Sequence, residues 1–208
     1  SVVTYPVESG LIYSLQNSKN NLVGSRNWVS ESKQLDSALK VGGSHIKSIA
    51  FVHRKGESNS KIQFNKMLLA AEGRGIHLID IAVSSLNEAK EELNRITVDA
   101  VYTSCDTLIQ SGGEEVVIEY AKERNIPSFA CGKSGVELGA LSGLVVDFDQ
   151  IGHIAGEKAV LILNGATPAS LETLTAARPF LFINITTATE LGVDISQSLY
   201  TKVREFIE

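Results

Sequence analysis

Short apolar runs alternate with amphipathic stretches through the central part of the chain, from residue 46 to residue 165. Apolar runs of about four to eight residues with polar flanks are typical of buried strands, whereas apolar positions three and four residues apart line one face of a helix. The pattern predicts strands at Ile49–Val52, Leu78–Val83, Ala100–Thr103, Ser128–Ala130 and Leu144–Phe148.

Helical patterns fill the intervals between these strands. The expected helices begin at Ser58-Asn59-Ser60, at Ser84 or Ser85, after Gly112-Gly113, at Ser134, and at Asp149 with an end at Gly165. Alternating strands and helices with continuously apolar strands indicate a parallel sheet covered on both faces. Right-handed crossovers then place all the strand-to-helix loops along one edge of that sheet. The sequence therefore predicts an α/β fold with a doubly wound parallel sheet.

The two flanks of the chain do not continue this repeat. The first flank predicts a strand at Val2–Thr4, a short helix at Val7–Leu15, a strand or crossing segment at 22–28 and a helix at Ser30–Leu39. The second predicts a strand at Pro179–Ile185, a short helix at Thr187–Leu191 and a last amphipathic helix capped by Ser196 and carrying Leu199, Val203, Phe206 and Ile207. We expect the flanks to form a second packing unit.

Composition places the chain among soluble globular proteins of one or two compact units. It has 208 residues, of which 43% are hydrophobic and 21% charged. The net charge of -5 and the absence of a Lys/Arg run argue against a nucleic-acid surface. No apolar run approaches the roughly 20 residues that span a bilayer, and the first residues lack a signal-peptide pattern. Two cysteines leave the redox compartment open.

Polar residues gather on the predicted loop edge. Ser58-Asn59-Ser60 opens a helix, and a helix start carries roughly +0.5 charge, which suits a small anion. Asp106 follows the third strand, and Gly132-Lys133 precedes another helix. Each group could equally be a helix cap or a solvated loop residue. Cys105, Cys131 and His53 lie near this edge without metal-type spacing, so neither a metal nor another cofactor is predicted.

Several stretches, in order, resemble the type I solute-binding proteins of ABC transporters, in the branch that includes tryptophan- and phenylalanine-binding receptors. They span essentially the whole chain, and only the ordered set is specific. The matching pieces are Val3-Thr-Tyr-Pro-Val-Glu-Ser-Gly-Leu11, Glu57-Ser-Asn-Ser60, Asp99-Ala-Val-Tyr102 with Asp106, Ile126-Pro-Ser-Phe-Ala130, Gly139-Ala-Leu141, Val146-Asp-Phe148 with Gly152, and Ile183-Asn-Ile-Thr-Thr-Ala-Thr-Glu-Leu-Gly192.

The resemblance implies a two-lobed receptor, not an enzyme, that closes on a small organic ligand, with an aromatic amino acid as first candidate. Its partner would be the membrane permease of an ABC importer, and its location periplasmic, or extracellular with a lipid anchor. The resemblance also implies that most of the N-terminal lobe is absent. Residues 1–28 would be its remnant, 29–165 a complete C-terminal lobe, and 166–208 a return segment packing on the remnant. Self-association through the incomplete lobe is expected.

Family ligand contacts carry over to Asn59, Ser60 and Asp106. The full set of predicted ligand-binding residues is Tyr5, Glu8, Glu57, Ser58, Asn59, Ser60, Cys105, Asp106, Thr107, Cys131, Gly132 and Lys133. The family usually has Asp where this chain has Tyr5, and again near Gly132. The loss of both carboxylates removes partners for an α-amino group, and Glu8 or Glu57 could take their place.

Two other functional classes remain open from the residues. One is the effector-binding lobe of a sugar- or nucleoside-responsive regulator, which shares the architecture. The other is a small hydrolase or transferase that uses Cys105 or Asp106. Turnover that depends on Cys105 would favour the enzyme, whereas stabilisation by a ligand without turnover would favour the receptor.

Overall fold

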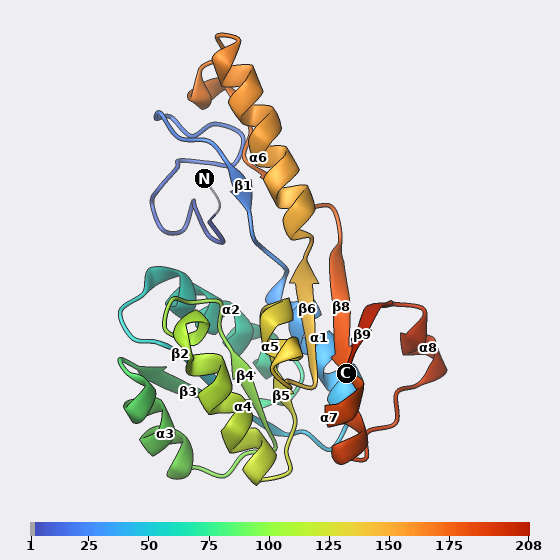
Figure 1. Ribbon diagram of the computed structural model, residues 1–208. Coiled ribbons are helices and arrows are strands. Elements are labelled where there is room, and N and C mark those ends of the chain that lie inside the picture. The colour runs from blue at the N-terminus through green and yellow to red at the C-terminus, as the bar shows by residue number, and fades with distance from the viewer. Residues whose placement is uncertain (1–2) are drawn as a thin grey trace. The chain divides into compact units, whose positions relative to one another are not determined.

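The computed structural model describes residues 3–208, which form two compact units. Of the described residues, the small unit comprises 3–29 and 146–179, and the large unit comprises Ser30–Val145 and Phe180–Glu208. The chain therefore passes from one unit to the other three times, after Val29, Val145 and Pro179. Figure 1 shows the elements of both units.

The large unit is built on a seven-stranded sheet with the order β3-β2-β4-β5-β6-β8-β9. Its strands are β2 (Ser48–Arg54), β3 (His77–Val83), β4 (Ala100–Thr103), β5 (Ser128–Phe129), β6 (Ser142–Val146), β8 (Pro179–Asn184) and β9 (Val203–Ile207). The neighbours β3–β2, β2–β4, β4–β5, β5–β6 and β8–β9 are parallel. The α/β fold with a mostly parallel sheet is confirmed.

Helices cover both faces of this sheet. They are α1 (Glu31–Gly42), α2 (Ser58–Glu72), α3 (Leu86–Asn94), α4 (Gly113–Glu123), α5 (Lys133–Glu137), α7 (Ile185–Glu190) and α8 (Gln197–Tyr200), with a short 3-10 helix at Ile109–Ser111. Alternate residues of a strand point to opposite faces. Ile49 and Phe51 pack in the same cluster as residues of α1 and α2, whereas Ala50 and Val52 pack with residues of α3 and α4. Burial on both faces explains why the middle of β2, Ile49–Val52, is apolar at every position.

The small unit contains the helix α6 (Phe148–Leu163), the 3-10 helix Pro168–Ser170 and a two-stranded parallel pair of β1 (Ser25–Arg26) and β7 (Leu174–Thr175). The Ser25 hydroxyl donates to the carbonyl of Ile151 over 3.1 Å, which ties β1 to α6. Much of α6 is apolar yet exposed: Phe148 is 55%, Val160 56% and Leu163 86% exposed. Within residues 3–208, no helix is both long and apolar enough to cross a membrane.

The predicted short helix at Val7–Leu15 is wrong, because this segment folds into successive turns. Gly10 has φ 74°, in the left-handed region, and the Leu11 and Ile12 amides both donate to the carbonyl of Pro6. In the predicted strand at Val2–Thr4, Val2 lies outside the described residues, and Val3 and Thr4 are not in a strand.

The start of α6 is also displaced from its predicted position. The predicted strand to Phe148 ends at Val146, and Asp147, not Asp149, caps α6 by accepting a hydrogen bond from the Gln150 amide over 3.1 Å. Both aspartates have the right chemistry for a cap. Which of the two caps the helix depends on where β6 ends.

The predicted last amphipathic helix is wrong beyond Tyr200. Only Gln197–Tyr200 is helical, and Val203–Ile207 forms β9. In β9, Phe206 pairs with Ile183 and Ile207 with Asn184 of β8. Pairing with a strand already in the sheet overrides a weak local helical pattern.

The boundaries between the two units differ from the boundaries of the predicted segments 1–28, 29–165 and 166–208. Helix α6 groups with the first 29 residues, and the last segment divides at Pro179. Residues 180–208 join the large unit because β8 and β9 extend its sheet beyond β6. Strand pairing therefore decides where this segment belongs.

Candidate functional site

Three loops follow the carboxyl ends of β2, β4 and β5 in the large unit. We use the term carboxyl edge for residues 54–57, 104–108 and 130–132 together with the first turn of α2. Open α/β sheets bind ligands at this edge of the sheet. All the predicted site residues lie on it or at the start of α5, except Tyr5 and Glu8, which belong to the small unit.

Polar contacts and a covalent bond hold the three loops together. The backbone amide of Arg54 donates to Asp106 Oδ2 over 2.7 Å. The Thr107 hydroxyl donates to Glu57 Oε2 over 2.7 Å, and the guanidinium of Arg54 also donates to that hydroxyl. A disulfide joins Cys105 to Cys131, whose Cα atoms are 5.6 Å apart. The carboxyl edge is therefore a cross-linked structure.

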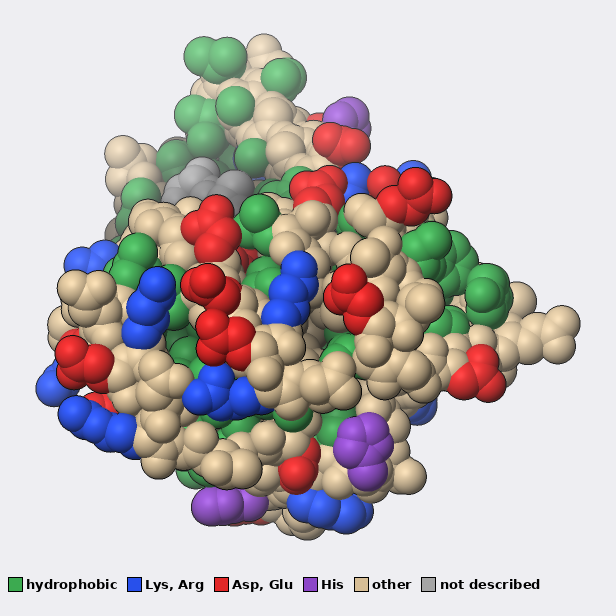
Figure 2. Space-filling view, turned by 60° about the horizontal axis from the view of Figure 1, so that its bottom comes forward, with side chains coloured by type: hydrophobic (Ala, Val, Ile, Leu, Met, Phe, Trp, Pro, Cys, Tyr) green, Lys and Arg blue, Asp and Glu red, His purple; other side chains and the backbone are tan. Residues whose placement is uncertain are grey.

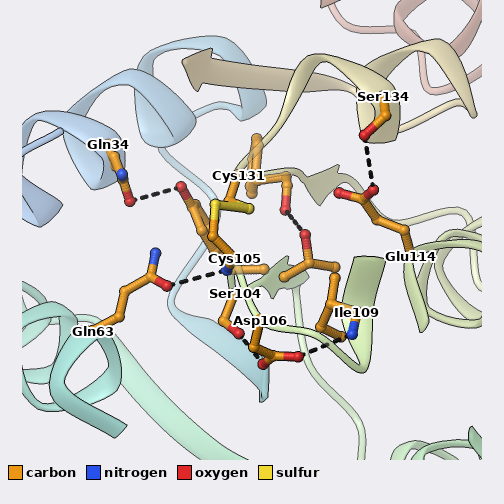
Figure 3. Close-up of a disulfide and its surroundings, with 12 residues drawn as sticks. Gln34, Gln63, Ser104, Cys105, Asp106, Ile109, Glu114, Cys131 and Ser134 are labelled. Atoms are coloured by element: carbon orange, nitrogen blue, oxygen red, sulfur yellow. Dashed lines mark hydrogen bonds between the residues drawn. A yellow bond between two sulfur atoms is a disulfide. The ribbon is translucent and has the colours of Figure 1, made fainter. Parts of the chain in front are cut away.

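Asp106 shapes its own loop instead of facing outward. It is 1% exposed, and its Oδ1 accepts hydrogen bonds from the amides of Leu108 and Ile109 over 3.0 and 2.9 Å. Its Oδ2 accepts a hydrogen bond from Ser104 (Figure 3) and another from the Arg54 amide. These bonds hold the turn before Ile109 and tie it to the loop after β2, and a direct ligand contact would require them to be exchanged.

The first turn of α2 differs from the predicted cap. Glu57, not Ser58, Asn59 or Ser60, occupies the cap position, and no side chain caps the turn. An α-helix leaves its first backbone N–H groups without acceptors inside the helix. Asn59 Oδ1 is buried and has no hydrogen-bond partner. A buried acceptor without a partner is costly, so a donor supplied from outside the chain would stabilise it.

In the oxidised protein the disulfide leaves Cys105 without the free thiol that a cysteine nucleophile needs. Gln63 of α2 accepts a hydrogen bond from the Cys105 amide over 3.2 Å, so the bridged loop is also fastened to the helix (Figure 3). Among residues 3–208, no three His, Cys, Asp or Glu side chains gather in a way that could hold a metal ion.

Lys133 has its charge partnered within the large unit. Its ammonium lies 3.0 Å from a carboxylate oxygen of Glu205 on β9 and 3.3 Å from one of Glu137 on α5. These two carboxylates raise the pKa of Lys133. A ligand anion would therefore compete with two acids for this lysine.

Glu8 lies in the turns that replace the predicted helix of the small unit, and Tyr5 directly precedes them. Tyr5 is 1% exposed and Glu8 is exposed. A ligand contact by Tyr5, and a role for Glu8 in compensating a missing carboxylate, remain predictions.

Glu114, in the first turn of α4, is a residue that the sequence did not single out. It is 5% exposed, and the Ser134 hydroxyl donates to its Oε2 over 3.3 Å (Figure 3). Burial raises its pKa from the ordinary 4.5 to about 7, although contacts with Ser134 and Thr103 oppose the shift. Glu114 thus lies between the end of β4 and the start of α5, next to the loops of the carboxyl edge. Its spacing looks like an ordinary acidic first turn, so no signal in the sequence marked it.

Charged groups of both signs are interspersed over the face of the molecule shown in Figure 2. No continuous basic stripe is visible on that face. This agrees with the overall charge of -5.

Sequence comparison relates the whole chain to one family. The profile described as "ABC transporter substrate binding protein" matches residues 1–207. The tyrosine-binding protein of Clostridioides difficile (strain R20291) is 28% identical over 186 residues, which are 88% of this chain and 53% of that protein. The chain therefore spans about half the length of this curated relative.

Solved structures show the same relationship. The ABC domain in complex with L-Trp from Streptococcus pneumoniae has a TM-score of 0.92 and 26% identity, covering 99% of this chain and 70% of that chain. A conserved domain protein from Vibrio cholerae has a TM-score of 0.89 and 26% identity, covering 97% of this chain and 68% of that chain.

We expect Glu114 to make stability depend on pH between about 4.5 and about 7. In that interval the unfolded chain releases the proton while the folded protein retains it, so the free energy of unfolding falls as pH rises. Glu114→Gln has no carboxyl group to titrate, so its free energy of unfolding should not fall in this way. The difference in unfolding free energy between the variant and wild type should grow from near zero at low pH to at most about 3 kcal/mol at pH 8. Urea unfolding at several pH values measures it, with the exposed Glu119→Gln as control. A constant difference between Glu114→Gln and wild type across pH would contradict the assignment.

Removal of the disulfide should destabilise the large unit. The bridge joins residues 26 apart in sequence, and an intact bridge limits the conformational freedom of the unfolded chain. The double variant Cys105→Ser, Cys131→Ser should lose about 3 kcal/mol of unfolding free energy relative to the oxidised protein. Reductant should weaken wild type and leave the double variant unchanged. If wild type without reductant and the double variant give equal unfolding curves, the bridge does not form in solution.

Proposed function

This chain belongs to the family of ABC transporter substrate binding proteins, and on that premise we propose that it binds a small organic ligand for an ABC importer. The observation that carries the proposal is the first turn of α2 at the carboxyl edge, where a buried Asn59 oxygen lacks a partner. Proteins of this family bind solutes and are not enzymes, so the expected activity is binding without chemical turnover.

An aromatic amino acid is the first candidate ligand. One relative is named a tyrosine-binding protein, and a similar solved structure holds L-Trp. The α-ammonium of an amino acid is a donor suited to the oxygen of Asn59, and its α-carboxylate suits the N–H groups of a helix start. Ser58 and Ser60 border this point, and Thr107, Cys131 and Gly132 lie on the adjoining loops. Tyr5 and Glu8 are proposed as contacts from the small unit.

We further propose that the ligand is held by hinge closure between two units. Closure needs connections that can bend without unfolding either unit. The chain supplies them where it passes between the units, after Val29, Val145 and Pro179. A membrane permease is the proposed partner that recognises the closed form.

The proposed location is outside the cytoplasm, with a lipid anchor as the specific form. Substrate binding proteins of this family are generally extracellular or periplasmic. The Cys105–Cys131 disulfide supports the proposal, because disulfides persist mainly in oxidising compartments.

Ligand titration followed by amide NMR tests the function. L-Tyrosine, L-tryptophan and L-phenylalanine should shift the amides of Ser58–Ser60, whereas D-ribose and adenosine, which suit a regulator, should not. We expect dissociation constants above the micromolar range, because the 186 matched residues span only 53% of the curated relative.

Asn59→Ala should weaken amino-acid binding roughly tenfold, the effect of losing a hydrogen bond to a charged group. Asn65→Ala, an exposed change on the same helix, should leave it unchanged. A sub-micromolar dissociation constant for any of the three amino acids would contradict the expected weak binding. Shifts caused only by the sugar or the nucleoside would overturn the receptor assignment.

We also propose that the small unit associates with a second copy through its exposed apolar residues. Val160 and Leu161 are 56% and 47% exposed on α6, next to Leu163 at 86%. Sedimentation should show concentration-dependent dimers, which Leu163→Glu should reduce because it places a charge in this apolar patch. The control Leu69→Glu, at a position 70% exposed on α2 of the large unit, should have no effect. A monomer at every concentration would reject self-association.

A further inference from the structure

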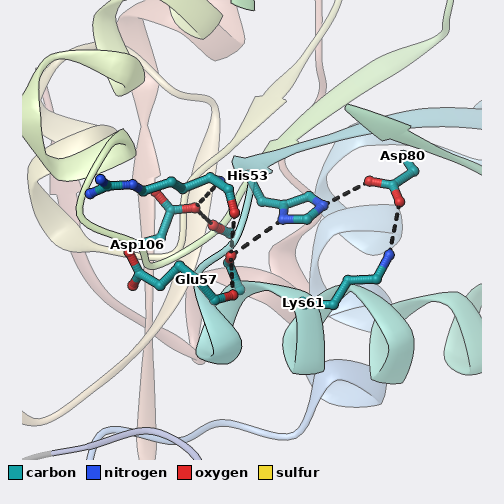
Figure 4. Close-up of polar contacts among 8 residues, drawn as sticks. His53, Glu57, Lys61, Asp80 and Asp106 are labelled. Carbon is teal, nitrogen blue, oxygen red and sulfur yellow. Dashed lines mark hydrogen bonds and ion pairs between the residues drawn. The ribbon is translucent and has the colours of Figure 1, made fainter. Parts of the chain in front are cut away.

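A buried histidine connects the first turn of α2 to the sheet. His53 lies on β2 with its side chain 2% exposed, and its Nε2 is 2.7 Å from Asp80 Oδ1 of β3 (Figure 4). Its other ring nitrogen, Nδ1, is 3.3 Å from the hydroxyl of Ser60. A carboxylate only accepts hydrogen bonds, so Nε2 carries the hydrogen of the His53–Asp80 bond. Asp80 thereby decides which ring nitrogen faces Ser60 and how the ring is turned.

Ser60 transmits this orientation to the loop. Its hydroxyl is 2.9 Å from the carbonyl oxygen of Arg54 and 3.0 Å from that of Glu57. The one hydrogen of this hydroxyl is donated to a single acceptor at a time, which is either one of these carbonyls or Nδ1 of His53. Arg54 and Glu57 are the residues that fasten the β2 loop to Asp106 and Thr107. The chain of contacts therefore runs from β3 through His53 and Ser60 to the cross-linked carboxyl edge.

The same residue types, serine, histidine and aspartate, make up hydrolytic triads, but this arrangement lacks an accessible nucleophile. Ser60 is 1% exposed, and its hydroxyl lies within hydrogen-bond distance of two backbone carbonyls as well as of His53. The His53 ring also stacks on Phe64, with centroids 5.6 Å apart and planes inclined by 12°. A hydroxyl and a ring that are both held in this way suit a positioning role better than attack on a substrate.

Asp80 is the solvent-accessible residue among Ser60, His53 and Asp80. Its side chain is 35% exposed, and its Oδ2 lies 3.1 Å from the ammonium of Lys61, the residue after Ser60. Asp80 thus contacts α2 both through His53 and through Lys61. Because Lys61 is 54% exposed, its ion pair is solvated and contributes little, whereas the His53 contact is buried.

We propose that His53, oriented by Asp80, is a positioning residue that holds Ser60 and the adjoining Asn59 in the geometry that receives a ligand's polar group. This inference rests on the proposed binding function of the first turn of α2. It adds His53 and Asp80, which touch no ligand themselves, to the residues on which affinity depends. Buried hydrogen-bond networks of this kind rigidify the groups at their end.

The test is NMR on the full 208-residue chain, with the histidine ring nitrogens and the backbone amides labelled. Asp80→Ala should fold, because Asp80 is partly exposed, but it should alter the ring-nitrogen signals of His53 and shift the amides of Asn59 and Ser60 without ligand. The matched control Lys61→Met keeps the His53–Asp80 bond and should leave the ring signals as in wild type. His53→Leu, which removes both ring nitrogens, should reproduce the amide shifts of Asp80→Ala.

With L-tyrosine as the probe, Asp80→Ala should bind about fivefold more weakly than wild type, the effect of one hydrogen bond. The double variant His53→Leu, Asp80→Ala should be no weaker than His53→Leu alone, because Asp80 acts through His53. The positioning role would be overturned if the losses of L-tyrosine affinity in the two single variants add up in the double variant. It would also be overturned if the ring-nitrogen signals of His53 change while the amide signals of Asn59 and Ser60 do not. If wild type does not bind L-tyrosine but the variants show the expected ring and amide shifts, the proposed amino-acid function is wrong. The positioning of Asn59 and Ser60 by His53 is then still supported.

Discussion

The cross-linking of three loops at the carboxyl edge is the constraint on which the rest of the large unit's chemistry depends. A parallel sheet brings the ends of β2, β4 and β5 to one edge, but it does not by itself fix the loops that leave it. Here the Arg54 amide, Asp106, the Glu57–Thr107 contact and the disulfide fix them. The edge is thereby organised before any ligand arrives, which reduces the ordering that binding would require.

This organisation uses most of the charged groups that the sequence offered as ligand contacts. Asp106 accepts bonds from backbone amides, Glu57 accepts from Thr107, and Lys133 lies between two carboxylates. Buried or partnered charges of this kind hold structure, and breaking one to contact a ligand carries a cost. The polar groups that a ligand could still contact are mainly uncharged. They are the amide oxygen of Asn59 and the N–H groups at the start of α2. Such groups suit a zwitterion with little net charge.

A second layer lies behind this edge. His53 and Asp80 support the first turn of α2 from β3, and Glu114 lies between the loops that follow β4 and β5. His53 and Glu114 are buried polar groups that make their hydrogen bonds within the large unit, where low dielectric makes an unpaired polar group costly. The two supports also act on different loops, so they can be tested independently.

The sequence by itself determined the fold class and the edge, because parallel strands buried on both faces are mostly apolar and their crossovers have one hand. It could place Ser58–Ser60, Asp106 and Cys131 on that edge, since each directly follows a predicted strand or opens a helix. It could not determine how those residues are used. Asp106 turned inward, the two cysteines bridged, and Val203–Ile207 became a strand, because each outcome depends on a partner far away in the chain. Only the tertiary structure brings those partners within bonding distance. The raised pKa of Glu114 likewise follows from burial, which local sequence does not encode.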